Sequence, residues 1–168
     1  MVVRLGAALC VAAILVTYSS SAISTTQSGN QRNNKLNTAV MRLGIVGTAS
    51  TYNPYQPGYK SGGTETASGE TYDPTAWTAA IQVDLREMFG GVRYGKDYRP
   101  TYALVESADK EVIVRINDVG PLEPGRVIDF NEQTMRYFDP TLQLGLIHPV
   151  RITPLRGDDW SPGPIAVR

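Results

Sequence analysis

The stretch Arg115-Ile116-Asn117-Asp118-Val119-Gly120-Pro121 decides how this chain folds. The β-branched run Val112-Ile113-Val114 leads into it and Gly120-Pro121 closes it, which predicts a buried strand that ends in a turn. Asp118 is then expected at the strand end, where burial disfavours a charged carboxylate and makes this residue a candidate proton donor. In the alternative, which stays open at this point, Asn117 and Asp118 only hydrogen-bond the turn backbone.

Size and composition limit the class of protein. The chain has 168 residues, enough for one ordinary domain with tails. Its formal net charge is +0 and its hydrophobic content is 42%, so it lacks the basic excess of a nucleic-acid binder. We therefore expect a globular domain, a monomer, with no nucleic-acid partner.

The N-terminus has the pattern of a secretory signal. Arg4 precedes a largely apolar stretch over 5–16, and the small residues Ser20-Ser21-Ala22 suit cleavage after Ala22. Residues 1–22 are thus predicted to be a signal peptide that directs export. The apolar stretch is shorter than the about 20 residues of a membrane span, and an uncleaved anchor stays open as the alternative.

Neither a cofactor nor a metal site is predicted. Cys10 is the single cysteine, and Ala7-Ala8-Leu9 before it lacks the small residue expected next to a lipidated cysteine, which disfavours a lipid anchor. His148 is the single histidine, and the carboxylates lack the spacing of a metal cage.

The remaining chain divides into a polar linker at 23–42, a domain at 43–155 and an unstructured tail at 156–168. Short helices are expected at 84–89 and 132–138. Many short strands, including 43–50, 101–106, 111–116 and a last strand within 142–153, predict a closed or partly closed β-barrel.

A loop rich in turn residues, from Asn53 to Gly69, carries or adjoins several tyrosines: Tyr52, Tyr55, Tyr59 and Tyr72. Aromatic rings in such a loop can stack on the apolar face of a sugar while their hydroxyls bond sugar hydroxyls. The alternative is that these rings only pin the loop to the barrel.

Several motifs together resemble the rare lipoprotein A family, whose core is a six-stranded double-psi β-barrel. The matching residues are Gly47-Thr48-Ala49-Ser50-Thr51-Tyr52, Thr66-Ala67-Ser68-Gly69-Glu70-Thr71-Tyr72-Asp73-Pro74, Thr78-Ala79-Ala80, Val114-Arg115-Ile116-Asn117-Asp118-Val119-Gly120-Pro121 and Arg126-Val127-Ile128-Asp129. They follow the family's order and span roughly 43–153, so the resemblance covers nearly the whole predicted domain.

The resemblance implies a protein of the periplasm or cell envelope of a bacterium that acts on peptidoglycan glycan strands, with cell-division or wall-assembly proteins as further candidate partners. Some members are lytic transglycosylases, in which one acid protonates the glycosidic oxygen and the sugar's own 6-hydroxyl then closes an anhydro ring. The family's catalytic aspartate falls on Asp118 and its motif glutamate on Glu70. Within the matched motifs, glycan contacts are predicted for Tyr52, Tyr72, Asn117 and Arg115.

This chemistry makes demands on both carboxylates. Asp118 must be protonated near neutral pH, which requires an apolar surround such as Val114, Ile116 and Val119. A second carboxylate at Glu70 would raise the pKa of the aspartate by repulsion or stabilise an oxocarbenium-like transition state. The alternative for Glu70 is a solvated loop residue.

The sequence also departs from the family pattern. Ile81 stands where the family has a histidine, Val119 replaces a frequent arginine, and extra residues lie around 86–98. Isoleucine neither shares a proton nor hydrogen-bonds a carboxylate, which favours a catalytically silent glycan-binding or wall-remodelling module. The pair Asp118 and Glu70 favours the enzyme, a lytic transglycosylase, because a binding groove for neutral sugars has little need of two carboxylates. A secreted protein inhibitor on the same barrel is a third, unsupported alternative.

Overall fold

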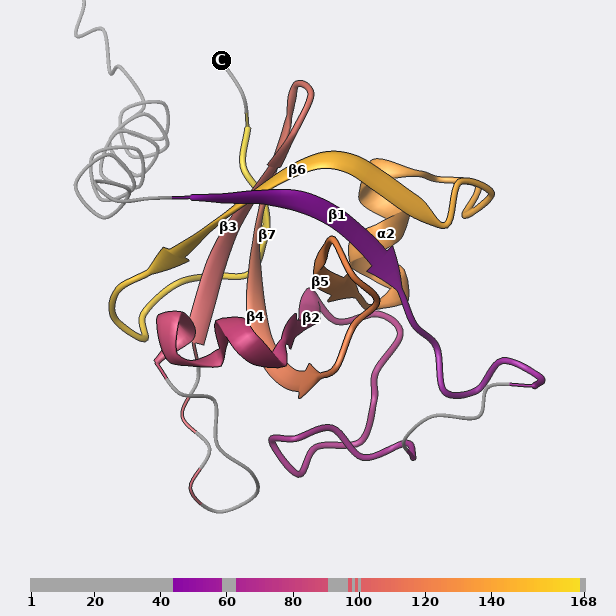
Figure 1. The fold of residues 1–168 in the computed structure, drawn as a ribbon, viewed down its shortest axis with the longest axis horizontal. Helices are drawn as coiled ribbons and strands as arrows, with labels where there is room; N and C mark the ends of the chain where they lie inside the picture. The colour runs from indigo at the N-terminus through magenta and orange to yellow at the C-terminus, as the bar shows by residue number, and fades with distance from the viewer. Residues whose placement is uncertain (1–43, 59–62, 91–96, 98, 100, 167–168) are drawn as a thin grey trace, which may run out of the picture. The chain divides into compact units, whose positions relative to one another are not determined.

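The computed structural model describes residues 44–58, 63–90, 97, 99 and 101–166, all of which belong to the unit Asn37–Arg168 (Figure 1). The predicted signal peptide and linker lie outside these residues. The elements are β1 (Ile45–Thr51), β2 (Thr78–Gln82), the 3-10 helix η1 (Val83–Phe89), β3 (Thr101–Ser107), β4 (Lys110–Gly120), β5 (Arg126–Phe130), α2 (Glu132–Phe138), β6 (Leu146–Leu155) and β7 (Gly163–Pro164). No helix in this part of the chain is both long and apolar enough to cross a membrane.

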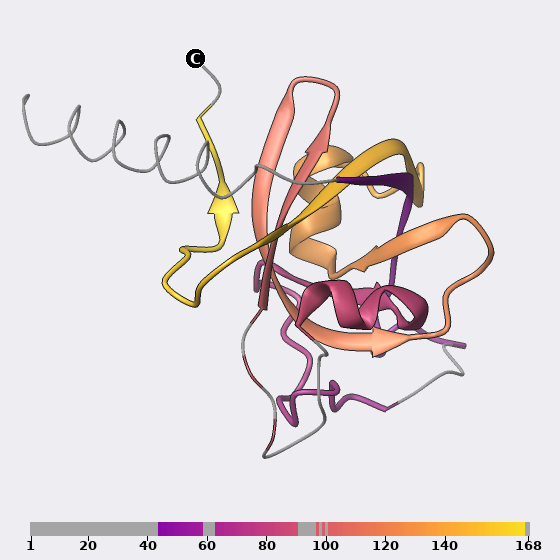
Figure 2. The ribbon, with the colours of Figure 1, turned by 60° about the vertical axis from the view of Figure 1, so that its left-hand side comes forward.

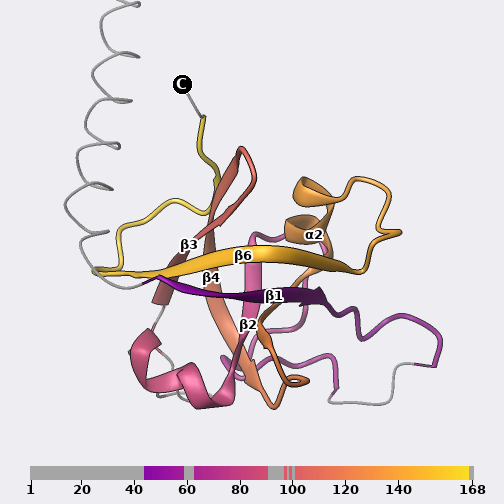
Figure 3. The ribbon, with the colours of Figure 1, turned by 45° about the horizontal axis from the view of Figure 1, so that its top comes forward.

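The strands close into a barrel. They are hydrogen-bonded in the order β2-β5-β1-β6-β3-β4, and a further pairing of β2 with β4 joins the two ends of this row. The pairs β1–β5 and β2–β4 are parallel and the other pairs of the ring are antiparallel. Figure 3 shows β1 and β6 running side by side across β2 and β4. The predicted six-stranded barrel with two short helices is confirmed.

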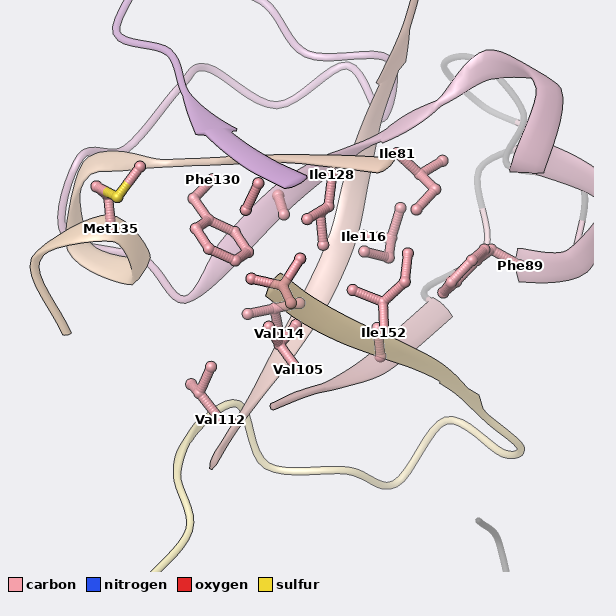
Figure 4. Close-up of a cluster of buried hydrophobic side chains, with 14 of the residues drawn as sticks. Ile81, Phe89, Val105, Val112, Val114, Ile116, Ile128, Phe130, Met135 and Ile152 are labelled. Atoms are coloured by element: carbon pink, nitrogen blue, oxygen red, sulfur yellow. The ribbon is translucent and has the colours of Figure 1, made fainter. Parts of the chain in front are cut away.

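Apolar side chains fill the barrel interior. The strands contribute mainly β-branched residues, among them Val105, Val114 and Ile152, none of which is exposed. Figure 4 shows Met135 of α2 and Phe89 of η1 at opposite ends of this cluster. Each side chain of this size contributes about 1.5–3 kcal/mol when it is fully buried, so the core alone can hold a barrel that has no disulfide.

Local signals in the sequence place the turns and helix ends correctly. The antiparallel register of β3 and β4 ends at Ser107 and Lys110, so a tight turn at Ala108 and Asp109 joins the two strands. Gly90 ends η1 with a φ of 78°, in the left-handed region that glycine adopts without strain. At the start of α2 the Asn131 side chain accepts a hydrogen bond from the backbone N–H of Thr134.

The C-terminal segment differs from the prediction of an unstructured tail at 156–168. Its described part runs back along the barrel, and β7 pairs antiparallel with β4 (Figure 2). Trp160 and Ile165 are 6% and 7% exposed, and the indole Nε1 of Trp160 donates to the carbonyl of Arg156 at 2.8 Å. The Gly and Pro residues suggested an unpacked tail, but the apolar side chains between them bury surface against the barrel.

Candidate active site

A bulge in β4 determines where Asp118 points. In the parallel pairing of β2 with β4, Ala79 faces Ile116 but Ala80 faces Asp118, so Asn117 is an extra residue on β4. Such a bulge breaks the alternation of side chains and re-aims the residue that follows. Ile116 therefore lies in the core while Asp118 lines a pocket. β4 continues past Asp118 to Gly120 because β2 pairs with it there, which corrects the prediction that Asp118 ends the strand.

A second carboxylate, that of Asp129, lies level with Asp118 on the barrel wall, one strand beyond β2. Ala80 of β2 is flanked by Asp118 on β4 and by Asp129 on β5. Register partners on neighbouring strands project to the same face, so the two carboxylates stand on either side of a small methyl group. Two strand spacings separate their Cα atoms by about 10 Å. Asp129 belongs to a motif of the family resemblance, but no role was predicted for it.

Asp118, Ala80 and Asp129 line a pocket of about 460 Å³. It is lined by Thr51, Tyr52, Gly63, Glu65, Ala80, Asp118, Val119, Gly120, Pro121, Leu122, Glu123, Arg126 and Asp129. Carboxylates dominate its charge, since Arg126 is the one cation among these residues. A larger cavity of about 670 Å³, between η1 and the ends of β3 and β6, is lined by none of the predicted site residues.

Two backbone N–H groups hold the Asp118 carboxyl group. Its Oδ1 accepts from the N–H of Ala67 at 3.0 Å and from the N–H of Val119 at 2.9 Å. Burial raises the pKa of Asp118, opposed by these hydrogen bonds and by the Tyr52 hydroxyl. Because the effect of burial outweighs these hydrogen bonds, the pKa of Asp118 stays above its ordinary value. The carboxyl group is therefore shifted toward the protonated form that a general acid needs.

Asp129 has the more strongly shifted pKa of the two. Burial raises the pKa of Asp129 to about 6, and the nearby charge of Asp118 adds to the rise. The neighbouring Ser50 hydroxyl and the Arg126 guanidinium lower this pKa but do not cancel the effect. Two carboxyl groups with raised pKa values in one open pocket are typical of acid–base sites.

Glu70 forms an ion pair with Arg115 of β4. Its carboxylate accepts two hydrogen bonds from Arg115, Nη1 to Oε1 at 2.9 Å and Nη2 to Oε2 at 2.7 Å, and a longer one from Asn117 Nδ2 at 3.5 Å. The Arg115 hydrogen bonds are the main reason why the pKa of Glu70 is lowered. Glu70, Arg115 and Asn117 are not among the residues that line the Asp118 pocket. Their catalytic and glycan-binding roles stay predictions.

The tyrosines form a packed cluster with one exposed member. Tyr72 is 4% exposed, its hydroxyl donates to the carbonyl of Tyr52 at 2.9 Å, and its ring meets those of Tyr52 and Tyr55 edge-on at 5.0 and 5.9 Å. Tyr52 lines the pocket, whereas Tyr55 is 53% exposed. The geometry favours loop-pinning for Tyr72, whereas Tyr55 keeps about half of its surface exposed. Tyr59 lies outside the described residues.

Two of the three departures from the family pattern, Ile81 and Val119, lie side by side in the structure. Ile81 is fully buried and lies opposite Val119 on β4 and Ile128 on β5. Figure 4 shows Ile81 pointing into the cluster near Ile116. Three apolar residues, Val119, Ile81 and Ile128, thus lie next to Asp118, Ala80 and Asp129 on the same three strands. His148 is elsewhere, with its Nδ1 at 3.0 Å from Thr48 Oγ1 on the outer surface, and the described residues contain no cluster of His, Cys, Asp or Glu suited to a metal ion.

A family model described as lytic transglycolase matches residues 45–152, and the chain belongs to this family. An endolytic peptidoglycan transglycosylase RlpA from Yersinia pestis is 35% identical over 88 residues, which are 51% of this chain and 19% of that protein.

A second relative of that name, from Pseudomonas aeruginosa strain UCBPP-PA14, is 40% identical over 89 residues, 52% of this chain and 21% of that protein. The match therefore spans about a fifth of the relatives' length. Among solved structures, the apo expansin of Clavibacter michiganensis superposes with a TM-score of 0.49 at 17% identity, over 70% of this chain and 53% of that one.

Proposed function

We propose that the protein is an exported, endolytic lytic transglycosylase that cleaves peptidoglycan glycan strands with Asp118 as general acid and base. The observation that carries the proposal is the Asp118 carboxyl group, held by two backbone N–H groups in an open pocket where burial raises its pKa. Family membership and the names of the two relatives support the substrate class.

In the proposed reaction, protonated Asp118 gives its proton to the glycosidic oxygen, and the bond from that oxygen to C1 breaks. The resulting oxocarbenium-like centre forms beside the Asp118 carboxylate that this transfer leaves behind, and the negative charge of that carboxylate stabilises it. The Asp118 carboxylate then takes the proton of the sugar's own 6-hydroxyl while that oxygen attacks C1. The products are a 1,6-anhydro end and a free hydroxyl, and no water is consumed.

For glycan binding we retain Tyr52, which lines the pocket, and add Tyr55, whose exposed ring can stack on a sugar face. Tyr72 is buried and contributes by holding the other two rings. Export rests on the N-terminal sequence pattern over 1–22 and on the envelope substrate named for the relatives.

One observation favours a second function, that of a silent glycan-binding module. Ile81 occupies the position of the family histidine and is packed in the core, so no imidazole can assist the acid from that position. The pocket would then bind glycan strands without cleaving them.

The test is incubation of the purified protein with peptide-free peptidoglycan strands, followed by mass spectrometry for anhydro-muramyl ends. Asp118→Asn removes the transferable proton at nearly constant shape, and Asp109→Asn, in the exposed turn between β3 and β4, is the matched control. We expect anhydro ends from the wild-type protein and the control and none from Asp118→Asn. Binding of strands by all three proteins without any product would contradict the proposal and support the silent module.

A further inference from the structure

The segment 63–72, called here the Glu70 loop, folds back on itself. An antiparallel bridge joins Glu65 to Thr71, and the N–H of Tyr72 donates to the carbonyl of Thr64 at 2.7 Å. At its tip the N–H of Thr66 donates to the carbonyl of Glu70 at 2.8 Å. These bonds make the loop a compact unit, so that a displacement of Glu70 also displaces the rest of the loop.

The Glu70 loop is attached to β4 at successive points. The N–H of Ser68 donates to the carbonyl of Asn117 at 3.0 Å, and the N–H of Ala67 donates to Asp118 Oδ1 at 3.0 Å. The ion pair between Glu70 and Arg115 lies beside these bonds, with 45% and 24% of the two side chains exposed. A bidentate arginine–carboxylate pair fixes orientation as well as distance.

The attachment matters for the acid itself. Oδ1 of Asp118 accepts from both Ala67 and Val119, so the acidic proton must reside on Oδ2. The Ala67 N–H therefore fixes which oxygen of Asp118 carries the transferable proton and how the carboxyl plane is turned.

We propose, building on the transglycosylase function above, that Glu70 is a positioning residue: its ion pair with Arg115 holds the Glu70 loop on β4 and thereby keeps the Ala67 N–H on Asp118 Oδ1. This role replaces the direct catalytic role predicted for Glu70, and it also accounts for Arg115, predicted to contact the glycan. Neither side chain needs to reach the substrate.

Activity of Glu70→Gln, Arg115→Gln and the double variant tests this proposal. Loss of one charge-assisted hydrogen bond to a reacting group lowers kcat about 10- to 100-fold. We expect similar losses from both single variants and no additional loss in the double variant, because all of them break one ion pair. Arg136→Gln, which breaks the Arg136–Glu132 pair at 2.8 Å on α2, is the matched control and is expected to keep activity.

The second readout is the pKa of Asp118, measured by carbon NMR of its carboxyl group. If the Glu70 loop detaches, the Ala67 hydrogen bond that lowers this pKa is lost, and both single variants raise the proton affinity of Asp118 about tenfold. Outside the Glu70 loop, the charged or titratable groups that line the pocket with Asp118 are Asp129, Tyr52, Glu123 and Arg126, and they are unchanged in both variants. Glu65 belongs to the loop and moves with it.

A through-space charge effect would instead move the pKa of Asp118 in opposite directions in the two variants, since one leaves an unpaired cation and the other an unpaired anion. That result, or a loss of activity confined to Glu70→Gln, would overturn the proposal. The NMR measurement does not depend on turnover, so an inactive wild-type protein would refute the transglycosylase function while leaving the positioning role measurable.

Discussion

Replacement of Asp129 by Asn is expected to stabilise the protein at neutral pH. Burial raises the pKa of Asp129 from its ordinary value of 3.8 to about 6. A group with such a raised pKa binds its proton more tightly in the folded state, so its contribution to stability is complete below about pH 4 and is lost as the pH rises through about 6. Asn keeps the shape and removes this titration.

The size of the effect follows from the two pKa values. The interval between 3.8 and about 6 corresponds to about 3 kcal/mol at 1.36 kcal/mol for each pKa unit. Because part of the carboxyl group remains hydrated, we expect a gain of about 1–3 kcal/mol in the free energy of unfolding at pH 7 and almost none at pH 4. A cost of this kind is typical of residues kept for function.

Urea denaturation of both proteins at pH 4, 5, 6, 7 and 8 measures this difference. Asp139→Asn is an informative control, because hydrogen bonds from the Leu144 N–H and the Thr141 hydroxyl lower the pKa of Asp139, and that variant is expected to lose relative stability as the pH rises. An Asp129→Asn protein that is less stable than wild type at pH 7, or a difference independent of pH, would refute the reasoning.

Further predictions concern the core, the C-terminal segment and the glycan surface. Ile81→His places an imidazole in a fully buried site and is expected to cost about 2–4 kcal/mol in unfolding free energy by urea titration, whereas unchanged stability would mean that the ring finds a partner. Trp160→Ala is expected to cost about 3 kcal/mol by the same measurement, and no change would show that the segment around β7 contributes nothing. Tyr55→Ala is expected to weaken glycan binding about threefold to tenfold in calorimetry, and equal affinity would exclude stacking.

Features set by neighbours along the chain were predictable from the sequence. The β-branched run at 112–114, the hairpin at 107–110 and the Asn131 cap depend on local chemistry, and the structure has all three. The β-barrel class could be predicted because a chain of many short strands is compatible with few architectures.

Features set by the register between distant strands were not predictable. The bulge at Asn117 exists only in the pairing of β4 with β2. Asp118 and Asp129 line one pocket because both are register partners of Ala80. The same holds for the Glu70–Arg115 pair, whose partners are 45 residues apart. In the C-terminal segment the Gly and Pro residues led to the prediction of an unstructured tail, although Trp160 and Ile165 are buried there.

Cleavage of peptide-free glycan strands in water enriched with oxygen-18 tests the central claim most directly. If Asp118 drives ring closure by the 6-hydroxyl, mass spectrometry will find anhydro-muramyl ends without the heavy isotope, and Asp118→Asn will yield none. Reducing ends that carry oxygen-18 would contradict the account, because they would mean that a carboxylate of the pair activates water and the protein is a hydrolase.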